Sequence, residues 1–82
     1  SFHTDSYFSG GLLDVRMDIA QDRIAEVRIF GDYFGRRDVA EAEDALRGKP
    51  YSPGEVRACL ESLPIGEYFS GISIDELVSA FF

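Results

Sequence analysis

The chain has 82 residues, of which 45% are hydrophobic and 28% charged, and this is the composition of one small globular domain. Eight Lys and Arg against 15 Asp and Glu give a net charge of −7, which disfavours nucleic acids and anionic membrane surfaces as partners. A single cysteine excludes an internal disulfide, and no apolar run approaches the ~20 residues of a membrane helix, so we expect a cytoplasmic protein.

The first third of the chain has the two-residue periodicity of β-strands. Apolar residues alternate with mostly charged ones, which predicts a strand with one buried face. The apolar members are Leu13, Val15, Met17 and Ile19. A short polar link at residues 21–23 predicts an antiparallel hairpin. Residues 5–9 are a candidate edge strand, which would bend into the next strand at Gly10-Gly11.

The second strand of this hairpin is expected over residues 24–30. Strict alternation divides its side chains between two faces. One face then carries Ala25, Val27 and Ile29. The other face carries Ile24, Glu26, Arg28 and Phe30.

The rest of the chain predicts three helices, because three pairs of residues have the spacing of a capping box ahead of an apolar stripe. These pairs are Asp38 with Glu41, Ser52 with Glu55, and Ser73 with Glu76. Gly48 has the position of a left-handed cap after the first helix, and Pro64 ends the second. Strands precede helices, so the predicted class is α+β: a small antiparallel sheet of two to three strands followed by three helices packed on it.

Few residues are candidates for catalysis. Cys59 lies in mid-helix on the apolar stripe, whereas a reactive thiolate needs an exposed, electropositive site, so we interpret it as structural. His3, Asp5 and Ser6 have the residue types of a catalytic triad, but a chain terminus does not hold such groups rigidly, and we interpret them as surface residues. With one histidine and scattered carboxylates, the sequence predicts no metal site.

Aromatic residues in expected connections are the more informative feature. Such residues either cap a small core or form a docking patch. They are Phe30, Tyr33 and Phe34 around the Gly31–Gly35 segment, and Tyr68 and Phe69 before the third helix. The neighbouring Arg36 and Arg37 favour a docking patch. The glycine-containing segment lacks the lysine and the Ser/Thr of a phosphate-binding loop.

The Gly31-Asp32-Tyr33-Phe34 motif, preceded by Ile29-Phe30 at the end of a hairpin strand, is the most specific pattern in the sequence. With it, nearly the whole chain resembles the C-terminal accessory domain of bacterial lipoate–protein ligases. That family also has a Gly-Gly entry, an alternating strand and a helix with a Leu-x-Gly ending. The matching stretches are residues 10–11, 13–19, 24–34 and 39–48.

The resemblance implies a SufE/NifU-like fold and a non-catalytic role. Full-length members use ATP, Mg and lipoate to form lipoyl-AMP, and they transfer the lipoyl group to a lysine of lipoyl-acceptor proteins. The chemistry belongs to a larger catalytic domain, so no cofactor, catalytic residue or metal is expected here. The expected partner is that catalytic domain, in cis or as a separate subunit. The residues expected to contact it are Gly31, Asp32, Tyr33, Phe34, Arg36 and Arg37.

Two other functions stay open on the sequence alone. A SufE/NifU-like sulfur-transfer or cluster-assembly protein would share this fold class, but it would need Cys59 exposed. A generic docking module would use the aromatic segment against an unrelated partner. The chain starts with Ser1 and ends at Phe82 inside an expected helix, so we expect residues 1–82 to be one domain and a fragment of a longer chain.

Overall fold

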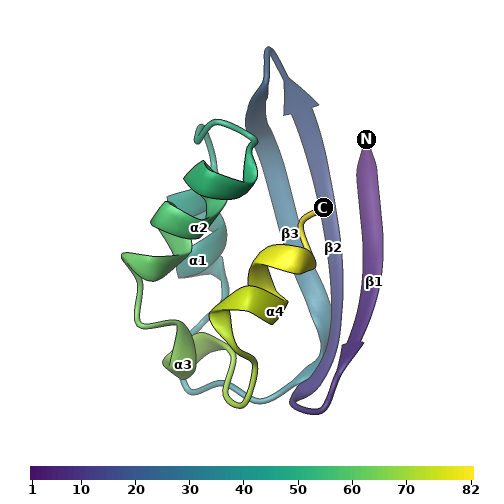
Figure 1. The fold of residues 1–82 in the computed structure, drawn as a ribbon, viewed down its shortest axis with the longest axis vertical. Helices are drawn as coiled ribbons and strands as arrows, with labels where there is room; N and C mark the ends of the chain where they lie inside the picture. Colours follow the sequence, from purple (N-terminus) through teal and green to yellow (C-terminus); the bar gives the residue numbers. More distant parts are fainter.

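The computed structural model describes all 82 residues as a two-layer α+β domain, with a three-stranded antiparallel sheet on one side and four short helices on the other (Figure 1). The strand order β1-β2-β3 follows the chain. The strands are β1 (Phe2–Phe8), β2 (Gly11–Ala20) and β3 (Arg23–Tyr33). The helices are α1 (Ala40–Leu46), α2 (Pro53–Glu61), α3 (Ile65–Tyr68) and α4 (Ile74–Ser79). The predicted fold class is confirmed, and none of the helices has the length and hydropathy needed to cross a membrane.

One hydrophobic core lies between the sheet and the helices. The predicted apolar face of β2 supplies three fully or almost fully buried residues, Leu13, Val15 and Met17. The helix layer contributes the largest buried side chains, Phe69 and Phe81. Because all four helices cover the same face, the opposite face of the sheet has no second layer (Figure 1). We call that uncovered surface the open face.

The prediction for the faces of β3 was wrong at its first residues. Ile24 is fully buried on the core side, and Ala25 is exposed. The register explains the difference: Asp18 pairs with Glu26 but Ile19 pairs with Ile24, so Ala25 is an extra residue on β3. Such a β-bulge reverses the alternation on one side of it, which a strict two-residue period does not anticipate.

Both predicted strand connections are present. Gln21 and Asp22 join β2 to β3 with positive φ angles of 54° and 61°, the conformation of a type I′ hairpin turn. The candidate edge strand is confirmed as β1, and it starts earlier than expected, at Phe2. Its turn passes through Gly10 into Gly11, whose φ of 140° favours glycine.

The helix starts agree with the capping prediction in two of three cases. Ser73 and Glu76 form the complete reciprocal box, and the Ser52 hydroxyl accepts a hydrogen bond from the Glu55 N–H. The prediction of a capping box at Asp38 and Glu41 was wrong, because the cap position is Val39 and the Glu41 carboxylate accepts a hydrogen bond from the Tyr68 hydroxyl instead. The short helix α3 was not predicted, since four residues carry no measurable period.

Candidate functional site

The segment from Gly31 to Tyr33 is the last part of strand β3, and the expectation that it belongs to a connection after the strand was wrong. Its residues pair with Gly11 to Leu13 of β2. Gly31 has a φ of 146°, and a Cβ there would lie 2.1 Å from the Leu12 carbonyl oxygen, so only glycine fits. Because the segment is extended and paired, its amides do not converge on one point as they do in a phosphate-binding loop.

After the strand, the chain is held against the α3 region by backbone hydrogen bonds. Phe34 forms an isolated bridge with Ser70, whose N–H donates to the Phe34 carbonyl over 2.7 Å. The Arg36 N–H donates to the Glu67 carbonyl, also over 2.7 Å. At Gly35 a Cβ would lie 2.1 Å from the carbonyl oxygen of Tyr68. Pairing with β2 before Phe34 and hydrogen bonds to the α3 region after it therefore fix the backbone of residues 31–36.

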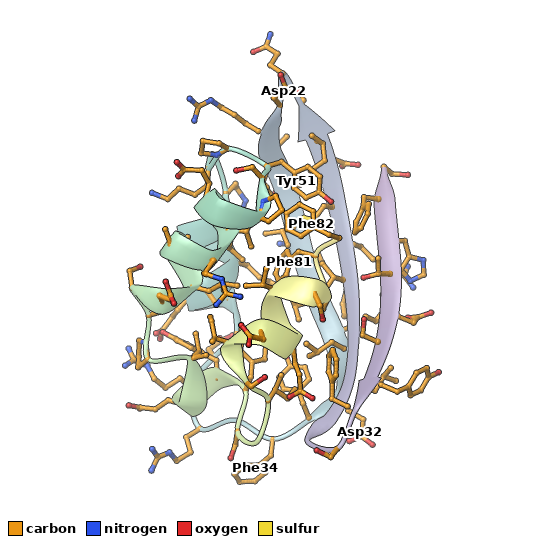
Figure 2. The ribbon with its side chains drawn as sticks, viewed as in Figure 1. Asp22, Asp32, Phe34, Tyr51, Phe81 and Phe82 are labelled. Atoms are coloured by element: carbon orange, nitrogen blue, oxygen red, sulfur yellow. The ribbon has the colours of Figure 1, made fainter.

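Three of the six predicted contact residues direct their side chains to solvent. The Phe34 ring is 71% exposed, a large exposure for an apolar side chain. Asp32 and Arg36 are exposed as well, and neither forms an ion pair in the structure. Asp32 and Phe34 lie at the same end of the domain, opposite the end that carries Asp22 (Figure 2). In sequence, an exposed aromatic side chain thus lies between an exposed anion and an exposed cation.

Tyr33 has a packing role. Its ring lies 5.2 Å from that of Phe69, between centroids, in a tilted arrangement. Burial raises the pKa of the Tyr33 hydroxyl, and the charges of Glu43 and Asp38 raise it further. The partly buried phenol is therefore neutral near pH 7, and it supports the strand end.

Arg37 belongs to a side-chain network with Glu41 and Tyr68. A guanidinium N–H of Arg37 donates to Oε1 of Glu41 over 2.8 Å, and the Tyr68 hydroxyl donates to the same oxygen over 2.7 Å. The guanidinium also lies 5.4 Å from the centroid of the Tyr68 ring. The hydrogen bond from Tyr68, with that from Arg37, holds the pKa of Glu41 below its usual value. This network ties the start of α1 to α3.

The second predicted aromatic pair, Tyr68 and Phe69, is not a surface patch. Both residues are almost completely buried, since α3 turns them into the core. The exposed aromatics on the open face are instead Tyr7, at 80%, and Phe30, at 51%. The sequence analysis did not identify Tyr7, although its position two residues from Asp5 on an alternating strand places both side chains on the same exposed face. Through Leu12, Tyr7 shares a row of the sheet with Asp32.

His3, Asp5 and Asp14 come together on the open face. His3 Nε2 lies 2.8 Å from Oδ1 of Asp14 and 3.5 Å from Oδ1 of Asp5. The expectation that the chain terminus would not hold His3 was wrong, because strand β1 begins at Phe2. Ser6 does not join this group, since it lies on the other face of the strand. The hydrogen bond from Arg16 lowers the pKa of Asp14, whose carboxylate is thus already paired.

Cys59 is a structural residue, as predicted. It is 8% exposed, and its thiol donates to the carbonyl of Ala45 over 3.4 Å. Burial raises the pKa of this thiol, which disfavours the thiolate. A sulfur carrier needs an accessible thiol, so the sulfur-transfer alternative loses its necessary residue.

The chain is similar in sequence to one family and to several known proteins. Residues 1–81 match the family described as bacterial lipoate protein ligase C-terminus. The lipoate–protein ligase of Streptococcus pyogenes serotype M5 is 38% identical over 76 residues, which cover 93% of this chain and 22% of that protein. Lipoate–protein ligase 2 of Staphylococcus aureus is 32% identical over 77 residues, covering 94% of this chain and 23% of that protein. The chain therefore spans less than a quarter of the length of these relatives.

A solved structure has a similar fold. It belongs to an archaeal lipoylation system, described as a bi-partite lipoate protein ligase and its E2 lipoyl domain, from Thermoplasma acidophilum. It superposes with a TM-score of 0.73 at 21% identity, covering 99% of this chain and 98% of that one.

Proposed function

The chain belongs to the family of bacterial lipoate protein ligase C-terminal domains, and we propose that it is the non-catalytic accessory domain of a lipoate–protein ligase. In this role it supports the ATP-dependent activation of lipoate to lipoyl-AMP, which precedes transfer to a lysine of a lipoyl-acceptor protein. The observation that carries the proposal is the family match along residues 1–81, nearly the whole chain.

The side chains of this domain support an accessory role. The single thiol is buried, and the single histidine already contacts two carboxylates on an open sheet surface. The glycine-containing segment is a paired strand that does not fit nucleotide phosphates. In the proposal, ATP, Mg and lipoate are bound by a larger catalytic domain, and this domain acts through contact with it.

The contact surface in the proposal is the end of the domain that carries Asp32, Phe34 and Arg36. An exposed aromatic side chain flanked by opposite charges is typical of a docking site, because it combines apolar contact with electrostatic selection of the partner. Gly31 and Gly35 allow the close backbone packing that holds this surface, and Tyr33 and Arg37 support it from behind. A domain docked there excludes water from a reactive adenylate when it closes over the site.

The test is reconstitution of the activation step. The Streptococcus pyogenes ligase, truncated to remove the segment that matches this chain, is assayed for lipoate-dependent pyrophosphate release from ATP. Addition of this chain is expected to raise the rate, as addition of the relative's own segment does. If the relative's segment restores the rate and saturating amounts of this chain have no effect, the accessory role is wrong. Binding without any effect on the rate would favour the generic docking module.

A further inference from the structure

Strand β1 has a free edge, whereas the other edge of the sheet is covered. At β3, the Ile24 N–H donates to the Lys49 carbonyl, and the Ile24 carbonyl accepts from the Gly48 N–H. Farther along the same edge, the Ile29 N–H donates to the carboxylate of Glu43. No backbone hydrogen bond from a turn, loop or helix reaches β1. A free edge offers unpaired backbone groups to another strand.

The register identifies which backbone groups are free. Phe8 and Gly11 flank a two-residue turn and form a hydrogen-bonded pair, and such pairs alternate along an antiparallel ladder. Thr4 therefore forms a hydrogen-bonded pair with Val15, whose backbone groups point toward β1. Ile29, the partner of Val15 on β3, then directs its backbone N–H away from β2, in agreement with the hydrogen bond from this N–H to Glu43. By the same alternation, three residues of β1 direct both N–H and C=O away from the sheet. They are His3, Asp5 and Tyr7.

The side chains along this edge indicate what kind of strand would fit. On the core side, Phe2 and Phe8 are only half-buried and would gain contacts from apolar neighbours. On the open face, Asp5 lies directly opposite Asp14, and like charges in this position are destabilising. Asp14 pairs directly with Arg16, whereas the one ion-pair contact of Asp5 is with His3, at 3.5 Å, and Arg16 acts on Asp5 only at longer range. A cationic side chain beside Asp5 would balance this pair of carboxylates.

We propose that the edge of β1 is a strand-addition site for an extended segment of the ligase's catalytic domain, with an Arg or Lys opposite Asp5 and apolar residues beside Phe2 and Phe8. This inference rests on the proposed function and assigns a partner to a second surface. The β1 edge adjoins the Asp32 row through Tyr7 and Leu12, so one partner can contact both surfaces.

A second copy of this chain fits the edge less well. The symmetric antiparallel register that uses all three free residues places Asp5 opposite Asp5 of the copy. Each chain also carries a net charge of −7, so two copies repel each other. The charge pattern favours a basic segment from another protein domain.

The test is residue-resolved amide hydrogen exchange of this chain, alone and with the truncated Streptococcus pyogenes ligase. In the free chain, the amides of His3, Asp5 and Tyr7 should exchange faster than those of Thr4 and Ser6, which serve as internal controls. In the complex, the three edge amides should slow by about tenfold or more. Asp5→Pro should weaken binding by about tenfold without breaking the ladder to β2, because it removes only an outward N–H. Asp5→Ala, which keeps that N–H, should have a smaller effect.

The outcomes separate this inference from the proposed function. If the complex forms and stimulates pyrophosphate release while the three edge amides exchange as in the free chain, the strand-addition site is wrong and the accessory role stands. If no complex forms, both are overturned. Protection that grows with the concentration of this chain alone would identify a second copy as the occupant, and it would also overturn the proposal.

Discussion

The backbone N–H of Ile29 donates a hydrogen bond to the carboxylate of Glu43, with 2.8 Å between the nitrogen and Oε2. Glu43 is the one charged residue that is buried, at 7% exposure. Helix α1 thereby covers an outward-facing backbone group of edge strand β3. Replacing the side chain leaves that donor buried and unpaired, so Glu43→Ala is expected to lower the free energy of unfolding by about 1–3 kcal/mol.

Urea denaturation of the Glu43 variants measures this effect. Glu43→Gln keeps an acceptor oxygen and should lose less stability than Glu43→Ala. Equal stability of the alanine variant and the unmodified protein would show that the contact contributes nothing.

The exposed end of the domain predicts a loss of activity without a loss of stability. Asp32→Ala combined with Phe34→Ala should reduce stimulation of pyrophosphate release by about tenfold, because an exposed aromatic ring and a charge at an interface centre carry much of the binding energy. The matched control is Phe82→Ala, which removes a partly exposed ring that lies away from Asp32 and Phe34 (Figure 2). An undiminished rate in the double variant, or an equal loss in the control, contradicts this assignment.

Replacement of two glycines by alanine should change the stability of the domain in opposite directions. A Cβ at Gly35 would lie 2.1 Å from the Tyr68 carbonyl oxygen, so Gly35→Ala should destabilise the domain by about 1–3 kcal/mol. At Gly54, on α2, a Cβ meets no atom within 4 Å. Gly54→Ala should therefore stabilise the domain by about 0.4–1 kcal/mol, since alanine restricts the unfolded chain. Thermal unfolding of the two variants measures both changes, and the same sign for both would refute the contact geometry.

The network of Glu41, Tyr68 and Arg37 predicts a pH dependence of stability. Hydrogen bonds from Tyr68 and Arg37 lower the pKa of Glu41 in the folded state from its ordinary value of 4.5. The stabilisation is therefore complete above the ordinary pKa, and it is lost as the pH falls through the lowered value. Glu41→Gln should be less stable than the unmodified protein at pH 7, and the difference should shrink in acid.

Urea midpoints measured from pH 7 down to pH 3 follow this difference. Glu61→Gln is the matched control, because Glu61 makes only a 3.9 Å contact with Arg57. A difference between Glu41→Gln and the unmodified protein that stays constant across this range would contradict the role of the network.

Much of the fold could be predicted because it depends on local patterns. The alternation around Val15 located the central strand, and Ser73 marked the start of the last helix through its capping box. Ile24 was placed on the wrong face because a bulge depends on the partner strand, which a one-dimensional period does not contain. Tyr68 looked like a loop aromatic because the burial of a four-residue helix depends on the layer beneath it.

The candidate site was harder to predict than the fold. The segment from Gly31 to Arg37 was singled out for its aromatic and charged residues, and the structure adds the reason for its glycines: a Cβ at Gly31 or Gly35 would lie 2.1 Å from a carbonyl oxygen. Which side chains face solvent could not be read from the segment alone. Tyr33 packs on Phe69, and Arg37 binds Glu41, and both partners lie outside the segment.

The first strand and the last helix are bound to each other. The hydroxyl of Thr4 donates to the carbonyl of Ala80 over 2.5 Å, and Tyr51 donates to the carbonyl of Phe81. Leu77 and Phe81 are also fully buried. During synthesis on the ribosome, β1, β2 and β3 emerge long before these residues, so the apolar side of the sheet lacks part of its cover until the final turn leaves the exit tunnel. Formation of the core therefore waits for the last helix, because it is completed only when residue 81 becomes available.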